Sequence, residues 1–376
     1  MLLIKNVRIN LENPREVSDV FIAGGKIEAI GRKLDPMLPN LEIIEGDGRT
    51  AVPGYIDRHV HITGGGGENG FASRVPEINL SDCIRGGVTT LVGLLGTDSV
   101  TRSVENLVAK TKALNSEGLT AFCLTGAYDY PSPTLTGSVK KDIAFVDEII
   151  GVKIAIADHR SSNMSKSDLI RLASEARVGG ILSGKPGFVH LHVGSGKRGL
   201  GLLFDILETE DIPIRTFHPT HVGRVFSDAV RFANMGGYID FTADEDAGET
   251  ARTLTKAFEQ APAGRITLST DSNGSMPEWN EREEIVGMGV GSISTLHQAV
   301  KSLVRECGVP LLQAVRPVTE TAAEALGLAG RKGRLAVGYD ADLNLLDDRL
   351  NLSTVIAGGT VMMENERVLK KGMFEK

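Results

Sequence analysis

The sequence predicts an α/β protein, a (β/α)8 barrel of the TIM type with a small β-sandwich domain built from both chain ends. Between residues 53 and 330, apolar runs rich in β-forming residues alternate with helical patterns, as expected for a parallel sheet that is covered on both faces. Both chain ends instead contain short strands with Gly-Gly turns. A length of 376 residues exceeds that of a usual compact domain, which favours one large domain and a smaller one.

The two chain ends are predicted to form the sandwich together. Residues 1–52 contain three short strand patterns with a hairpin turn at Gly24-Gly25, and residues 333–376 repeat the pattern with a turn at Gly358-Gly359. Neither end has enough strands to bury a face alone, so the simplest arrangement pairs them. The predicted limits are therefore 1–52 and 333–376 for the sandwich and 53–332 for the barrel.

The central region contains the eight strands that such a barrel needs. Helical patterns lie between them, for example 103–118 and 166–180, the latter with Ser165 as its N-cap and Gly179-Gly180 as its end. A doubly wound open sheet has the same local patterns, so periodicity alone does not establish closure. The predicted strands are 54–60, 88–95, 119–126, 152–158, 188–194, 212–218, 238–243 and 265–271.

Charge and cysteine usage restrict the class of partner. The net charge of −7 and the pI of about 5.7 give no overall attraction for nucleic acid or for an anionic membrane. No stretch approaches the length of uncharged apolar sequence that spans a bilayer. Three widely spaced cysteines are expected to be reduced thiols, which favours a cytoplasmic protein. A small-molecule ligand is the expected partner.

Metal-capable side chains gather at the ends of the predicted strands, where barrels of this type form their active sites. The first strand ends in His59-Val60-His61, and residues i and i+2 of a strand point to one side, so both imidazoles could reach one ion. Alone, each such residue has a structural interpretation, for instance a core histidine or an Asx turn. Their order at successive strand ends nevertheless predicts a metal site, with the candidates His59, His61, Lys153, His190, His192, His218, His221 and Asp271.

Lys153 is predicted to face the barrel interior, because it shares a strand face with Ala155 and Ala157. A buried ammonium group is costly unless it is paired, neutral or modified. One solution is a salt bridge to a neighbouring strand residue such as Asp57. The other is carboxylation of the lysine nitrogen, because an anionic carbamate can bridge two cations.

This ordered set resembles the binuclear amidohydrolase superfamily, and the resemblance extends over essentially the whole chain. It implies two divalent ions per chain, with zinc as the leading expectation, although histidine and carboxylate ligands also accept cobalt, manganese or nickel. A metal-bridging hydroxide would attack a carbonyl that the ions polarise, and Asp271 would carry the proton to the leaving amine. The implied ligands are His59, His61 and Asp271 for the more buried ion, His192 and His221 for the other, and carboxylated Lys153 as the bridge.

A second group of residues predicts a pocket for a zwitterion with carboxylate groups. The run Gly64–Gly67 follows the HxH pair and lets the backbone approach a ligand, while Glu68 supplies an anion for an ammonium group. Surface salt bridges are the alternative interpretation of the charged members. The other members follow further strands and are Tyr128, Arg160, Arg224 and Ser275.

The combination of HVHITGGGGE with GAYDYPSP, VKIAIADHRSS, THVGR and STDSNGSMPEW resembles the isoaspartyl (β-aspartyl) dipeptidases. The resemblance implies hydrolysis of small acidic β-aspartyl dipeptides and a homo-oligomer, with an octamer as the leading expectation. It assigns Glu68 to the substrate's α-amino group, Arg160 and Arg224 to its carboxylates, and Tyr128 to the developing oxyanion. The pocket would also be lined by Gly66, Thr97 and Ser275.

Two alternatives are kept. A cyclic amidase of the dihydroorotase or hydantoinase type shares the fold and the metals, but its substrate has no ammonium group for Glu68 to bind. A metal-free scaffold, as in the brain response-mediator relatives of the hydantoinases, predicts missing ligands, whereas every ligand position is filled in this sequence.

Overall fold

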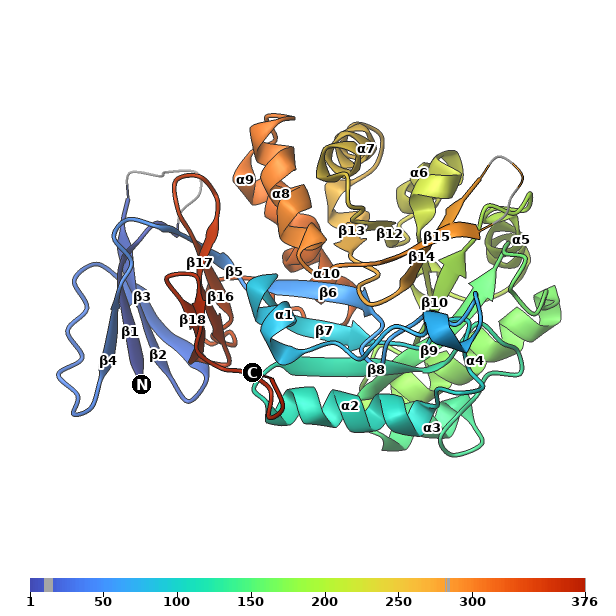
Figure 1. Cartoon of the computed structure of the whole chain (residues 1–376), viewed down its shortest axis with the longest axis horizontal. Helices are drawn as coiled ribbons and strands as arrows, with labels where there is room; N and C mark the ends of the chain where they lie inside the picture. The colour runs from blue at the N-terminus through green and yellow to red at the C-terminus, as the bar shows by residue number, and fades with distance from the viewer. Residues whose placement is uncertain (10–15, 281, 283–284, 376) are drawn as a thin grey trace.

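The structure, a computed structural model, describes residues 1–9, 16–280, 282 and 285–375. It confirms the predicted barrel with its attached sandwich (Figure 1). Eight strands form one parallel sheet in the order β13-β12-β11-β10-β9-β8-β7-β6. A parallel bridge between Val60 and Ser272 connects the two ends of this sheet, so the barrel is nearly closed.

Each barrel strand is a short apolar run that is buried on both faces. In β9, for example, all eight residues are buried, as expected where helices cover a parallel sheet. The barrel strands are β6 (Tyr55–Val60), β7 (Val88–Gly93), β8 (Thr120–Gly126), β9 (Ile149–Ile156), β10 (Phe188–Val193), β11 (Phe217–Thr220), β12 (Ile239–Thr242) and β13 (Ile266–Ser269).

Helices surround this sheet (Figure 1). Ser103 and Ser165 cap α2 and α4, and Ser165 forms a reciprocal capping box with Asp168, as the sequence predicted for Ser165. The helices are α1 (Leu80–Arg85), α2 (Val104–Ser116), α3 (Val139–Phe145), α4 (Lys166–Ser183), α5 (Gly201–Thr209), α6 (Phe226–Asn234), α7 (Ala247–Gln260), α8 (Thr295–Arg305), α9 (Leu311–Val315) and α10 (Glu320–Ala325).

The predicted end of α4 at Gly179-Gly180 is wrong. The helix continues to Ser183 and ends at Gly184, whose φ of 70° is the left-handed conformation typical of a helix terminus. The two glycines instead permit close packing, since a Cβ on Gly179 would lie 2.9 Å from the Lys140 carbonyl oxygen and one on Gly180 would lie 2.7 Å from Gly187 Cα. Close packing against neighbouring segments therefore explains why glycine occupies positions 179 and 180.

Two further segments differ from the prediction. The sixth strand was expected at 212–218, but a 3-10 turn occupies Ile214–Thr216 and β11 begins only at Phe217. An antiparallel hairpin of β14 (Ser275–Trp279) and β15 (Ile285–Val290) follows the barrel and was not predicted. This hairpin begins at a residue of the predicted substrate pocket.

The sandwich consists of two sheets, one of four strands and one of five. The Gly24-Gly25 and Gly358-Gly359 turns connect β2 to β3 and β17 to β18, as predicted. Strand β5 from the N-terminal part pairs with β16 from the C-terminal part, so both chain ends build the second sheet. The strands are β1 (Leu2–Val7), β2 (Ser18–Ala23), β3 (Lys26–Gly31), β4 (Glu42–Glu45), β5 (Thr50–Pro53), β16 (Leu343–Leu346), β17 (Leu352–Ala357), β18 (Thr360–Glu364) and β19 (Arg367–Val368).

A half-buried histidine connects the barrel to the segment between β16 and β17. His297 Nδ1 accepts a hydrogen bond from Tyr55 Oη at 3.0 Å, and Nε2 donates to the Leu350 carbonyl at 2.9 Å. Burial lowers the pKa of His297 to about 4. Between about pH 6.5 and pH 4, His297 is therefore less protonated in the native state than in the unfolded chain.

This difference predicts acid destabilisation through His297. The contribution of neutral His297 to the free energy of unfolding is present above about pH 6.5 and is lost as the pH falls toward about 4. The loss between about pH 7.5 and pH 5 is about 2 kcal/mol. We expect His297→Gln to melt at a lower temperature at neutral pH but to show a smaller drop in melting temperature on acidification. An equal drop in both proteins would contradict this assignment.

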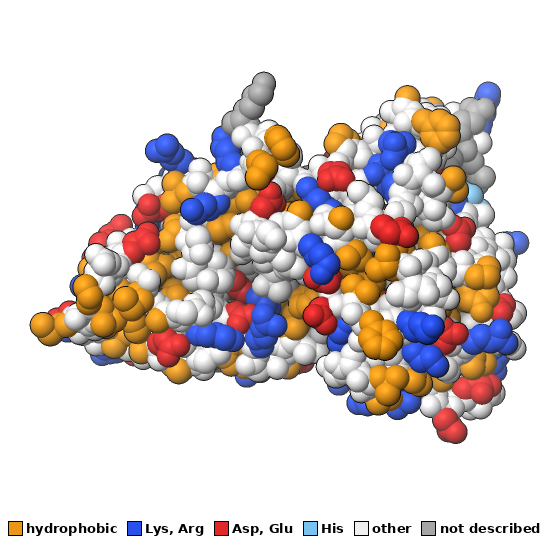
Figure 2. Space-filling model, turned by 90° about the horizontal axis from the view of Figure 1, so that it is seen from below, with side chains coloured by type: hydrophobic (Ala, Val, Ile, Leu, Met, Phe, Trp, Pro, Cys, Tyr) orange, Lys and Arg blue, Asp and Glu red, His pale blue; other side chains and the backbone are white. Residues whose placement is uncertain are grey.

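On the surface seen from below, the described residues mix basic and acidic side chains and form no extended field of one sign (Figure 2). That face therefore offers no continuous basic surface to nucleic acid. None of the helices formed by the described residues is both long enough and apolar enough to span a membrane.

Candidate metal centre

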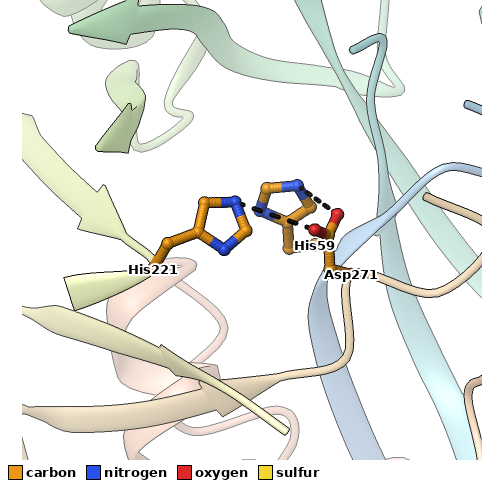
Figure 3. A group of neighbouring side chains, drawn as sticks. All are labelled: His59, His221 and Asp271. Atoms are coloured by element: carbon orange, nitrogen blue, oxygen red, sulfur yellow. Dashed lines mark ion pairs between the residues drawn. The ribbon is translucent and has the colours of Figure 1, made fainter. Parts of the chain in front are cut away.

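Four of the predicted metal ligands meet at the carboxyl ends of the barrel strands. Asp271 Oδ1 lies 3.1 Å from His59 Nε2 and 3.0 Å from His61 Nε2, and Asp271 Oδ2 lies 3.9 Å from His221 Nε2. Figure 3 shows His59, His221 and Asp271 pointing toward one another from three different segments. One ligand atom from each of these three lies within 4.8 Å of the others, so a single cation could contact all three.

Unusual backbone conformations aim two of these side chains. His221 follows β11 with a φ of 59°, and Asp271 follows β13 with a φ of 56°. Residues with a Cβ seldom adopt this left-handed conformation. His61 also needs a glycine opposite it, because a Cβ on Gly96 would lie 2.8 Å from His61 Cε1.

Lys153 is fully buried in β9 and faces this cluster, as predicted. Its Nζ lies 3.2 Å from His59 Nε2, and no ion pair to Asp57 is formed within the part of the chain that the structure describes. Asp57 instead accepts hydrogen bonds from the Thr270 hydroxyl and amide. Burial lowers the pKa of Lys153 to about 7, despite the opposing charges of Asp271 and Asp240.

The donor set fits a cation better than it fits a proton network. His59 Nε2 faces both a carboxylate oxygen and the lysine nitrogen, but one ring nitrogen cannot donate to the first and accept from the second at once. Among the described residues, His221 Nε2 and Asp271 Oδ1 are buried without a hydrogen bond. Burial also lowers the pKa of His59 to about 3, which keeps the ring neutral and able to ligate.

His192 joins the site through a chain of hydrogen bonds that sequence reasoning missed. Its Nε2 donates to Asp158 Oδ2 at 2.8 Å, while its Nδ1 accepts from Tyr128 Oη at 2.6 Å. Nδ1 therefore carries the ring's lone pair, which a metal ion could bind only in place of the Tyr128 hydroxyl. The same Asp158 carboxylate accepts from Arg160 Nε at 3.0 Å and from Nη2 at 2.9 Å, so it also orients the arginine. Burial raises the pKa of Tyr128 well above its ordinary value, so the phenol remains a donor at neutral pH.

The glycine-rich loop brings Glu68 to the same side of the cluster as Arg160. Glu68 Oε1 lies 3.3 Å from Arg160 Nη1 and accepts from Thr97 Oγ1 at 3.2 Å. Glu68 Oε2 accepts from Ser275 Oγ at 2.8 Å. Gly66 in this loop has a φ of 79°, a conformation that favours glycine. The structure thus brings these predicted pocket residues together.

Arg224 lies at the edge of the site. It is exposed in the 3-10 turn that directly follows His221, and its charge acts on Tyr128, His192 and His221. A guanidinium group in this position is accessible to a ligand that enters from solvent.

Comparison with known proteins agrees with this architecture. The amidohydrolase family profile matches residues 228–373. A crystal structure of a β-aspartyl dipeptidase from Fervidobacterium islandicum AW-1, in complex with the β-Asp-Leu dipeptide, is 42% identical in sequence. The similarity covers 98% of each chain with a TM-score of 0.91. The chain belongs to the amidohydrolase family.

Other members of the family are more distant. A dihydroorotase from Staphylococcus epidermidis is 28% identical over 165 residues, which span 41% of this chain and 37% of the relative's length. The D-hydantoinase from a Thermus species is 19% identical with a TM-score of 0.67, and this similarity shows the fold alone. Proteins of the amidohydrolase family generally depend on two metal ions, which accords with the cluster of histidines and Asp271.

His190 and His218 were sequence candidates outside the implied ligand set, and the structure places both beneath the cluster. His190 Nε2 lies 3.0 Å from His59 Nδ1, so it fixes the ring that faces Asp271. His218 Nδ1 lies 2.6 Å from Arg58 Nη2 in the barrel interior.

Asp158 is a site residue that the sequence prediction did not include. Its position could have indicated a role, since it ends the predicted fourth strand two residues before Arg160.

Proposed function

We propose that the chain is a metal-dependent dipeptidase that hydrolyses β-aspartyl dipeptides. The observation that carries the proposal is the contact between Glu68 and Arg160 beside the histidine cluster, because it sets an anion and a cation together next to the reacting position. A β-linkage leaves the α-amino and α-carboxylate groups of the aspartyl residue on one branch, and such a pair matches both. The similarity to a β-aspartyl dipeptidase over 98% of the chain supports the same activity.

We propose that six residues hold two divalent ions, with zinc as the first expectation. When bound, the ions would polarise the scissile carbonyl and lower the pKa of a water molecule toward neutrality. Lys153 would bridge them as a carbamate, which requires the neutral amine that a lowered pKa favours. The proposed ligands are His59, His61, Lys153, His192, His221 and Asp271.

The chain's own residues would bind the substrate and move its proton. Asp271 accepts the proton of the attacking water and passes it to the leaving amine. Tyr128 donates a hydrogen bond to the carbonyl oxygen as negative charge develops on it. Glu68 binds the α-ammonium group, while Arg160 and Arg224 bind the carboxylates. The pocket is lined further by Gly66, Thr97 and Ser275.

A cyclic amidase is the second candidate. It rests on the partial match to dihydroorotase and on a shared fold. Its substrates carry no ammonium group, so Glu68 would have no substrate group to bind. Metal analysis of the purified protein, followed by hydrolysis of β-Asp-Leu, α-Asp-Leu, dihydroorotate and hydantoin, separates the candidates. Preferential cleavage of β-Asp-Leu supports the dipeptidase, and preferential ring opening overturns it.

Glu68 gives a sharper prediction about the ammonium group. Glu68→Gln should reduce kcat/KM for β-Asp-Leu by roughly 10- to 150-fold, the effect of losing a charge-assisted hydrogen bond. Acetylation of the substrate's amino group should cost the wild type a similar factor and should cost the variant little more. Additive losses would show that Glu68 does not bind the ammonium group.

We also propose a homo-oligomer, with an octamer as the first expectation, in the cytoplasm. The three cysteines are free thiols, and Cys83 and Cys123 are buried, which accords with a reducing compartment.

A further inference from the structure

The loop that carries Glu68 is folded tightly on the segment that follows it. A Cβ on Gly64 would lie 1.9 Å from the Val75 carbonyl oxygen, and one on Gly66 would lie 2.3 Å from that of Ser73. The amide of Val75 donates to the Gly65 carbonyl at 3.0 Å. These contacts turn the loop back on itself, but they leave several carbonyl groups inside it to be satisfied by another donor.

Arg102 is that donor. Its guanidinium group donates to the carbonyl oxygens of Thr63, of Gly65 at 3.1 Å and of Val75 at 2.8 Å. The first two lie between His61 and Glu68, Thr63 just before the glycine run and Gly65 within it, and the third lies in the returning segment. One side chain, placed just before the Ser103 N-cap of α2, therefore joins both arms of the loop.

Burying the guanidinium group of Arg102 costs free energy, and filling space between the loop and α2 would not require a charged side chain. Arg102 is only 8% exposed and forms no ion pair with any residue that the structure describes. Burial, together with the neighbouring charge of Arg74, lowers the pKa of Arg102. The two terminal nitrogens of Arg102 donate to three backbone carbonyls, and the planar, forked guanidinium group fixes their geometry in a way that lysine cannot reproduce.

A cavity of about 550 Å³ borders this contact. Thr63, Val75 and Arg102 line it, together with Arg74 and Glu77. None of the proposed metal ligands or substrate-binding residues lines this cavity. A small cation in solution could therefore reach the position of the guanidinium group if the side chain were removed.

We propose that Arg102 is a positioning residue for substrate specificity, which holds the glycine-rich loop so that Glu68 stands where the substrate's ammonium group binds. The assignment rests on the proposed dipeptidase function. Arg102 hydrogen-bonds none of the proposed metal ligands or substrate-binding side chains; it acts through the backbone between His61 and Glu68. Its removal should therefore affect recognition of the ammonium group more than the chemical step.

The test compares two substrates in three variants. Arg102→Ala should raise KM for β-Asp-Leu, lowering kcat/KM by roughly 10- to 100-fold, while metal content stays at the wild-type level. For the N-acetylated dipeptide, kcat/KM should change by less than about 3-fold. Added methylguanidine should restore part of the activity toward β-Asp-Leu. Arg102→Lys should retain an intermediate KM. Arg74→Ala, a change in the same cavity, should behave like the wild type and show no response to methylguanidine.

Three results would overturn the assignment: equal losses on both substrates, loss of bound metal from Arg102→Ala, or wild-type kinetics in that variant. If Arg102→Ala does not fold, Arg102→Lys decides by the same comparison of substrates. A wild-type protein without activity toward β-Asp-Leu refutes the dipeptidase function itself, so the two failures are distinguishable.

Discussion

Asp271→Asn is expected to lower kcat for β-Asp-Leu by about a hundred- to ten-thousand-fold, the range attributed to general acid–base catalysis. Burial alone would raise the pKa of Asp271, but its interactions with the neighbouring imidazoles of His59 and His221 hold the pKa well below its usual range. The residue is therefore a carboxylate at neutral pH and can accept a proton. An amide of the same shape keeps an oxygen ligand but has no basic site.

Two measurements separate proton transfer from metal binding in this variant. Metal content should fall only in part, because the amide oxygen still ligates, and the acid limb of the pH–rate profile should change because its titrating base is gone. Asp57→Asn is a suitable comparison, since Asp57 is also buried near His59 but hydrogen-bonds Thr270. Near-normal turnover by Asp271→Asn would identify another group as the base.

Much of the fold was predictable from local sequence because its signals are local. Alternating strand and helix patterns predicted the number of barrel strands and placed them well except for the sixth, and Ser165 as an N-cap predicted the start of α4. Gly179-Gly180 misled because glycine either ends a helix or permits close packing, and only the tertiary neighbours decide between them. The β14–β15 hairpin has no clear alternation of apolar and polar residues and was missed.

The predicted site residues came together because parallel strands place their carboxyl ends at one edge of the barrel. The residues that orient them were harder to predict. Asp158 has a signal in the sequence, but its partner His192 is 34 positions away. Arg102 has none, because its acceptors are backbone carbonyls that lie 27 to 39 positions away. A carbonyl is present at every residue, so no side-chain pattern marks such a contact.

Lys153→Ala is the second change with a large expected effect, a loss of both bound metal and activity. Lys153 Nζ lies 3.2 Å from His59 Nε2 in a fully buried position. As a cation it would oppose a metal ion at His59 and Asp271, whereas the carbamate formed from the neutral amine and carbon dioxide, with release of a proton, supplies two oxygen atoms that share one negative charge. Because burial lowers the pKa of this lysine to about 7, a substantial fraction of the amine is neutral at physiological pH.

A bridging carbamate and a simple salt bridge at Lys153 predict different responses of Lys153→Ala to added small acids. With Lys153→Ala, added bicarbonate or a short carboxylic acid should enter the vacated space and return part of the metal content and part of kcat, since either supplies a bridging carboxylate. The same acids should not rescue Asp271→Asn, in which the bridge is intact and the base is missing. The wild-type protein offers two further tests. Metal-depleted wild type, prepared without carbon dioxide, should regain full metal content only when bicarbonate is added with the metal. Labelled bicarbonate should give a carbamate signal in the NMR spectrum of the wild type, and Lys153→Ala should lack this signal. A Lys153→Ala protein with full metal content and normal turnover would refute the bridging role, because the remaining histidines and Asp271 would then suffice to hold both ions.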